Sequence, residues 1–124
     1  MSQKLILIID DDNRNIFALK AVLKAKGFRC LSAISAQEGF SIIQQNPEVS
    51  IVLMDMMMPD MDGYQAIATM KKSALMQNIP VLAVTAQAMV GDRERCLSAG
   101  ASGYVSKPIN VDELLIQIEK FTQK

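Results

Sequence analysis

Short apolar segments alternate with amphipathic segments five times along this chain of 124 residues. Three of the apolar segments are continuously hydrophobic, which is typical of strands that are covered on both faces. Each connection is long enough for a right-handed crossover, so the pattern predicts an α/β fold with a parallel sheet between two layers of helices. The predicted strands are Leu5–Ile9, Phe28–Ala33, Ser50–Met54, Ile79–Val84 and a brief one around Tyr104–Val105.

The amphipathic segments predict five helices, over residues 13–26, 35–46, about 63–72, about 87–99 and 111–121. The first places Ile16, Leu19 and Leu23 on one stripe and is followed by Gly27, a residue suited to a left-handed cap. The second opens with a capping box formed by Ser35 and Glu38. The last carries the strongest stripe: Val111, Leu114, Leu115, Ile118 and Phe121.

The composition excludes several classes of protein. Thirteen basic and thirteen acidic residues cancel, so we expect no direct binding to nucleic acid. No apolar stretch approaches the roughly 20 residues of a membrane span, and no signal peptide precedes Asp10, so we expect a cytoplasmic protein without membrane insertion. Cys30 and Cys96 lack metal-site spacing and are interpreted as buried small hydrophobes. Because the chain has no histidine, any phosphohistidine donor must be another molecule.

Polar residues follow four of the five predicted strands. Ligands of an open parallel sheet bind beyond the carboxyl ends of the strands, where the strand order reverses. We therefore expect these residues to lie at one edge of the sheet: Asp10, Asp11, Asp12, Asp55, Thr85, Ala86, Ser106, Lys107 and Pro108.

Such a set of side chains favours phosphoryl chemistry. Two carboxylates about 4 Å apart repel by roughly 4 kcal/mol at an effective dielectric of 20, so a cation is needed, and oxygen ligands favour Mg²⁺. With Lys107 as a second positive charge, Asp55 is the best candidate for a nucleophile toward phosphorus. A phosphorylated Asp55 would attract Thr85, and Tyr104 could then turn inward.

These motifs together resemble the receiver domain of two-component response regulators. The similarity covers the chain from Lys4 to about Phe121, as a single receiver domain over residues 1–124. The resemblance implies a flavodoxin-like fold, with five parallel strands in the order 2-1-3-4-5 and five flanking helices. The segments that carry it are Leu5–Asp11, Val52–Gly63, Pro80–Ala86 and Gly100–Pro108.

The resemblance also implies a role for each site residue. Asp55 would be the phosphoryl acceptor, and Mg²⁺ would bind directly to Asp11, Asp55 and the Met57 carbonyl and largely through water to Asp10. Lys107 and Thr85 would contact the phosphoryl group, Tyr104 would be the switch aromatic, and a cis peptide bond would precede Pro108.

The implied function is a phosphorelay switch rather than a turnover enzyme. The phosphoryl donor would be a histidine kinase or a histidine phosphotransfer protein. A downstream target protein would read the surface formed by the fourth helix, fifth strand and fifth helix. We expect a monomer or a weak dimer that depends on phosphorylation.

Two positions depart from the best-known receivers, which often carry polar side chains where this chain has Met57 and Gln87. Because Met57 cannot orient a water molecule, we expect a comparatively long-lived phosphorylated form. Residues 12–19 especially resemble receivers of hybrid sensor kinases. The chain ends just after its fifth predicted helix, which favours a stand-alone regulator or relay intermediate over a transcription factor.

Three alternatives stay open at this point. Asp10 to Asp12 taken alone would more often cap a helix. A phosphatase of the haloacid dehalogenase type also uses aspartate and Mg²⁺, although Arg14 stands where that motif requires Thr or Val. A module that binds partners without being phosphorylated is the third alternative, and the complete set of acids, threonine and lysine argues against it.

Overall fold

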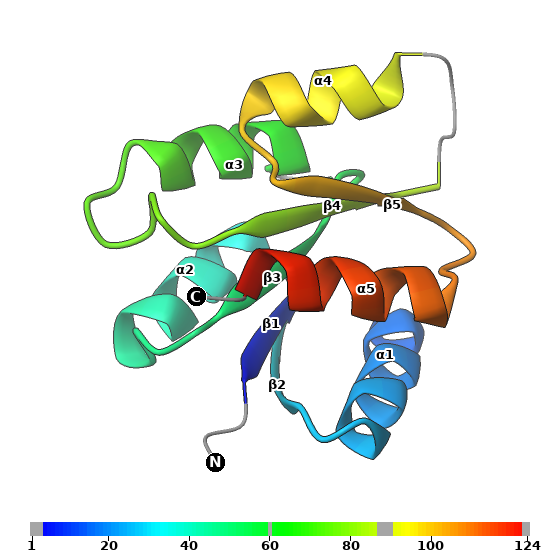
Figure 1. Ribbon diagram of the computed structural model, residues 1–124. Helices are drawn as coiled ribbons and strands as arrows, with labels where there is room; N and C mark the ends of the chain where they lie inside the picture. Colours follow the sequence, from blue (N-terminus) through cyan, green and yellow to red (C-terminus); the bar gives the residue numbers. More distant parts are fainter. Residues whose placement is uncertain (1–3, 60, 87–90, 123–124) are drawn as a thin grey trace.

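A five-stranded parallel sheet forms the centre of the molecule, with the strand order β2-β1-β3-β4-β5 (Figure 1). The computed structural model describes residues 4–59, 61–86 and 91–122. The sheet confirms the predicted α/β class and the order that the resemblance implied. Its strands are β1 Leu5–Ile9, β2 Arg29–Ala33, β3 Ile51–Asp55, β4 Val81–Thr85 and β5 Gly103–Ser106.

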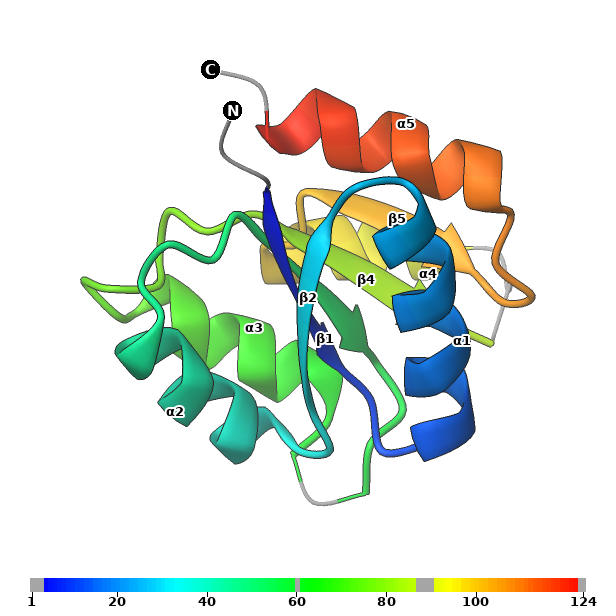
Figure 2. The same cartoon turned by 90° about the horizontal axis from the view of Figure 1, so that it is seen from below.

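Helices cover both faces of this sheet (Figure 2). Side chains of α1 and α5 share one core cluster, and side chains of α2, α3 and α4 share the other. Among the described residues, no helix is long and apolar enough to cross a membrane. The helices are α1 Asn13–Ala25, α2 Ala36–Gln45, α3 Gly63–Lys71, α4 Asp92–Ala99 and α5 Val111–Thr122.

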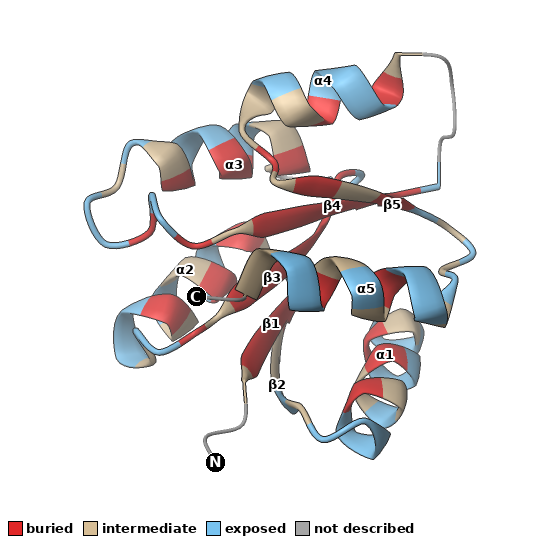
Figure 3. Cartoon of the chain, in the orientation of Figure 1, coloured by how far each residue is buried: buried red, intermediate tan, exposed pale blue. Residues whose placement is uncertain are grey.

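The inner strands separate the two clusters by the alternation of their side chains. In β1, Ile6 and Ile8 pack toward α1 and α5, whereas Leu7 and Ile9 pack toward the other layer. Every residue of β1, β3 and β4 is buried, as the continuous hydrophobic pattern predicted (Figure 3). The core therefore holds the carboxyl ends of these three strands in fixed register.

Helix ends largely follow the predictions, with two differences of detail. Gly27 and Gly100 have positive φ after α1 and α4. The Ser35 hydroxyl accepts from the Glu38 N–H at 3.1 Å, and the Glu38 carboxylate accepts from Ile34 N–H, one residue before the cap. The fourth helix begins at Asp92 rather than near residue 87, because Gly91 occupies the N-cap with a left-handed φ of 93°; residues 87–90 of that prediction, Gln87 included, lie outside the described residues.

The interpretation of the cysteines as buried hydrophobes is right for Cys96 and wrong for Cys30. Cys96 is fully buried on α4, whereas Cys30 is only half-buried. Cys30 lies on β2, an edge strand whose first four residues stay partly or fully exposed. An edge strand has a neighbour on one side only, so its side chains keep more contact with water.

Candidate functional site

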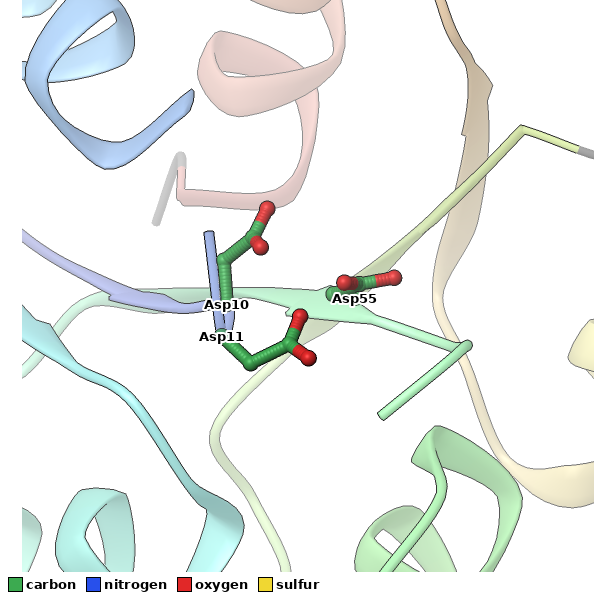
Figure 4. Close-up of side chains that lie close together, drawn as sticks. All are labelled: Asp10, Asp11 and Asp55. Carbon is green, nitrogen blue, oxygen red and sulfur yellow. The ribbon is translucent and has the colours of Figure 1, made fainter. Parts of the chain in front are cut away.

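The carboxyl ends of four strands bring the predicted site residues together. Asp10 and Asp11 follow β1, Asp55 ends β3, Thr85 ends β4 and Lys107 follows β5. The register places Asp55 beside Val84 and Thr85 beside Ser106. Figure 4 shows the carboxylates of Asp10, Asp11 and Asp55 as near neighbours at the ends of β1 and β3. The predicted edge of the sheet is thus a single site.

Three carboxylates form a compact acidic cluster at this edge. One oxygen from each of Asp10, Asp11 and Asp55 lies within 4.8 Å of the others. Asp10 and Asp55 are buried, at 2% and 5% exposure, whereas Asp11 is exposed. Asp10 and Asp55 are thus enclosed by the protein, whereas Asp11 faces solvent, so an ion can reach the cluster from the side of Asp11.

Local hydrogen bonds orient Asp10. Its Oδ1 accepts from the Asp12 N–H at 2.8 Å, and its Oδ2 accepts from the Asn15 amide. Asn15 lies in the first turn of α1 and was not assigned a role from the sequence. Asp12 itself caps α1 by accepting from the Arg14 N–H at 2.9 Å. The capping interpretation is therefore right for Asp12, while Asp10 and Asp11 belong to the acidic cluster.

Lys107, in the loop after β5, brings its ammonium group to the acidic cluster. Its Nζ lies 3.6 Å from Asp10 Oδ2 and 4.0 Å from Asp55 Oδ2. The Lys107 N–H donates to the Thr85 carbonyl at 2.8 Å, which ties the loop after β5 to the end of β4. The peptide bond between Lys107 and Pro108 is cis, as the resemblance implied.

The Asp55 carboxyl has a raised pKa in this environment. Burial is the largest cause, and the Asp10 carboxylate raises the pKa further. The Met57 N–H, which donates to Asp55 Oδ1 at 3.0 Å, and the Lys107 ammonium both lower it. Burial and the neighbouring acid together raise the pKa of Asp55 by more than one ammonium group lowers it. A further cation near Asp55 would therefore favour its ionised form.

The donor set of the cluster fits Mg²⁺. Carboxylate oxygens are hard ligands, and a site with few protein ligands and an open side leaves room for the water molecules that Mg²⁺ retains. Among the described residues, three acids gather here and one lysine, Lys107, forms ion pairs with them. Asp10, Asp11 and Asp55 are the side chains that would hold the ion. The Met57 carbonyl remains a predicted fourth ligand.

Thr85 and Tyr104, the predicted switch pair, lie on neighbouring strands. Thr85 is buried at the end of β4, and Tyr104 lies half-buried on the adjacent strand β5. The Tyr104 carbonyl accepts from the Gln117 amide at 3.0 Å, which links β5 to α5. Movement of this pair on phosphorylation stays a prediction.

Comparisons with known proteins agree on one family. The family model described as response regulator receiver domain matches residues 6–119. The polar-differentiation response regulator DivK of Brucella ovis is 30% identical over 118 residues, covering 95% of both chains.

Solved structures show the same similarity. A putative response regulator from Chloroflexus aurantiacus superposes with a TM-score of 0.92 at 27% identity, over 99% of this chain and all of that one. A CheY-like receiver domain protein from Methanospirillum hungatei is 33% identical, with a TM-score of 0.84 over 96% of this chain and 93% of its own.

Proposed function

Since this chain belongs to the response regulator receiver domain family, and is thus a phosphorelay switch, we propose that Asp55 is its phosphoryl acceptor. The observation that carries this assignment is the position of Asp55. Asp55 is buried and its Oδ2 lies 4.0 Å from the Lys107 ammonium, while its Oδ1 accepts from the Met57 N–H. Asp10 is also buried and close to Lys107, but both of its carboxylate oxygens already accept hydrogen bonds from the start of α1.

The chemistry that follows is a single displacement at phosphorus. A carboxylate oxygen of Asp55 forms the new bond, and the bond from phosphorus to the donor's leaving group breaks. Lys107 is placed to attract the phosphoryl oxygens, and we assign Thr85 to hydrogen-bond them afterwards. A bound Mg²⁺ supplies the additional positive charge that this transfer needs.

We assign the domain extent, the donor and the surface that a target reads in the same way. Residues 1–124 form one receiver domain, and the donor is a phosphohistidine on a kinase or phosphotransfer protein. Tyr104 couples the phosphoryl site to the surface of α4, β5 and α5, where a target protein binds. The link between the Tyr104 carbonyl and α5 supports that path, because a change in β5 would be felt by the neighbouring helix.

Intact mass after treatment with acetyl phosphate and Mg²⁺ tests the acceptor. Wild type and the exposed-acid control Glu48→Gln should gain one phosphoryl group, and Asp55→Asn should gain none. Glu48 precedes β3 and so lies at the opposite end of that strand from Asp55. The assignment would be refuted if Asp55→Asn were phosphorylated to the wild-type extent. It would also be refuted if the wild type gained no phosphoryl group either with or without Mg²⁺.

A further inference from the structure

A cavity of about 350 Å³ lies next to the proposed phosphorylation site, between the loop after β3 and α4. Met56 and Met57, which directly follow Asp55, form one wall, and Thr85 forms another. The cavity also reaches Tyr64 on α3 and Arg95 on α4. Its size falls in the lower range of small-molecule pockets, so it has room for more than a phosphoryl group.

Arg95 is held in the wall of this cavity by an aromatic ring. Its guanidinium carbon lies 4.8 Å from the centre of the Tyr64 ring. The Tyr64 hydroxyl contacts the buried Cys96 sulfur at 3.8 Å, which anchors the ring against α4. A guanidinium held over a ring by a cation–π contact can still donate N–H groups to an anion.

Asp92, one turn earlier on α4, forms a long ion pair with Arg95. Asp92 Oδ1 lies 3.9 Å from Arg95 Nη1, which is too long for a hydrogen bond. Asp62, which also lines the cavity, uses its Oδ1 to cap α3 through the Gln65 N–H at 2.9 Å. The Arg95 side chain is 66% exposed, so a small anion can reach it from solvent.

Arg95 and Lys107 therefore offer positive charge to different parts of a bound donor. Lys107 contacts Asp10 and Asp55 directly and so lies beside the phosphoryl group. Arg95 lines the same cavity as Met57 and Thr85, and a donor that extends from Asp55 into this cavity would bring its remaining atoms toward Arg95.

We propose that Arg95, oriented by Tyr64, is a specificity-determining residue that favours acyl phosphates as small-molecule donors by binding the departing carboxylate. In that reaction the bond between phosphorus and the acyl oxygen breaks as the Asp55 oxygen bonds to phosphorus. The electron pair stays on the acyl oxygen, so negative charge grows on the carboxylate, and a nearby guanidinium stabilises it. The inference rests on Asp55 being the acceptor.

Phosphoramidate is the matching donor without that charge. Its nitrogen is already protonated and leaves as neutral ammonia, so Arg95 has no growing negative charge to stabilise. The experiment compares the rate constants of Asp55 phosphorylation by acetyl phosphate and by phosphoramidate, with Mg²⁺, followed by intact mass over a series of donor concentrations. Arg93→Ala is the matched control, because Arg93 is an exposed arginine on the same helix.

Arg95→Ala should lower the rate constant with acetyl phosphate by about 3- to 10-fold, between the effect of a screened ion pair and that of a charge-assisted hydrogen bond. The rate with phosphoramidate should stay at the wild-type value, which also shows that the variant is folded. With acetyl phosphate, the rate constant of Arg95→Lys should fall between those of wild type and Arg95→Ala. Tyr64→Leu should show part of the same selective loss. High salt should reduce the ratio of the acetyl phosphate rate to the phosphoramidate rate in the wild type. The same ratio in Arg95→Ala should stay unchanged.

An equal loss with both donors, or a selective loss of the same size in Arg93→Ala, would overturn the inference and leave the proposed function intact. A wild-type protein that reacts with neither donor would instead refute Asp55 as a phosphoryl acceptor, and this inference with it.

Discussion

Replacement of Asp55 by asparagine should stabilise the metal-free domain even though it removes the proposed phosphorylation site. The substitution keeps the shape of the side chain and an oxygen that can accept from the Met57 N–H. It removes one of three negative charges that lie within 4.8 Å of one another. The expected result is therefore a gain in the free energy of unfolding in the absence of divalent ions.

The size of the gain follows from the distances. At an effective dielectric of 20, repulsion between Asp55 and Asp10, whose oxygens lie within 4.8 Å of each other, costs at least about 3.5 kcal/mol, and attraction to Lys107 at 4.0 Å returns about 4 kcal/mol. These two interactions nearly cancel. Two unfavourable contributions remain. One is the repulsion from the exposed Asp11, which water screens to about 1–2 kcal/mol, and the other is the cost of burying the Asp55 charge. We expect Asp55→Asn to gain about 1–2 kcal/mol, or about 3–10 °C in Tm for a domain of this size.

Thermal unfolding in EDTA followed by titration with MgCl₂ measures this effect. Wild type should gain about 1.4–2.7 kcal/mol when free Mg²⁺ is 10 to 100 times the Kd, and Asp55→Asn should gain less because it has lost a ligand. The difference between the two proteins should therefore shrink or change sign as Mg²⁺ is added. Glu48→Gln, which removes an exposed acid outside the cluster, should behave as wild type under both conditions.

The pH dependence gives a second check with a definite sign. Because the pKa of Asp55 is raised in the folded protein, folded Asp55 holds its proton more tightly than unfolded Asp55. Its stabilising contribution is thus present at low pH and is lost as pH rises from about 4 through the folded-state pKa. The advantage of Asp55→Asn in EDTA should grow over that interval. A variant that is less stable than wild type in EDTA at neutral pH would refute the electrostatic reasoning.

Three further predictions concern the phosphorylated form and the core. Met57→Asn should speed loss of the phosphoryl group on the order of tenfold, since an amide can orient the attacking water; an unchanged release rate in a phosphate assay would contradict this. Gly63→Ala should cost about 1–3 kcal/mol in urea unfolding, because an added Cβ would lie 2.7 Å from the Met56 Cα, and a neutral effect would show that the loop yields. Ile118→Ala, at a fully buried position, should cost about 2–5 kcal/mol, whereas Ile116→Ala, 68% exposed on the same helix, should stay within about 0.5 kcal/mol; equal losses would contradict the packing.

The fold could be predicted because its signals are local. Continuous apolar strands such as Leu5–Ile9 and the helix stripe that includes Ile118 follow from the periodicity of neighbouring residues. The site could be predicted because one topological rule brings the carboxyl ends of parallel strands to one edge. The strand order itself came from the resemblance, because alternation of strands and helices fits several orders.

Contacts between loops were decided only by the tertiary structure. The sequence presents Asp10, Asp11 and Asp12 as equivalent neighbours, yet Asp12 caps α1 while the other two face Asp55. Neither the amide of Asn15 on Asp10 nor the stacking of Arg95 on Tyr64 has a signal in local periodicity. The first depends on the course of the turn between β1 and α1, and the second on how α3 and α4, which are distant in the chain, pack together. The sequence by itself thus determined the helices and strands and the edge of the sheet where the acids gather. The packing of those elements decided which side chains meet there, because distances between side chains depend on the whole core.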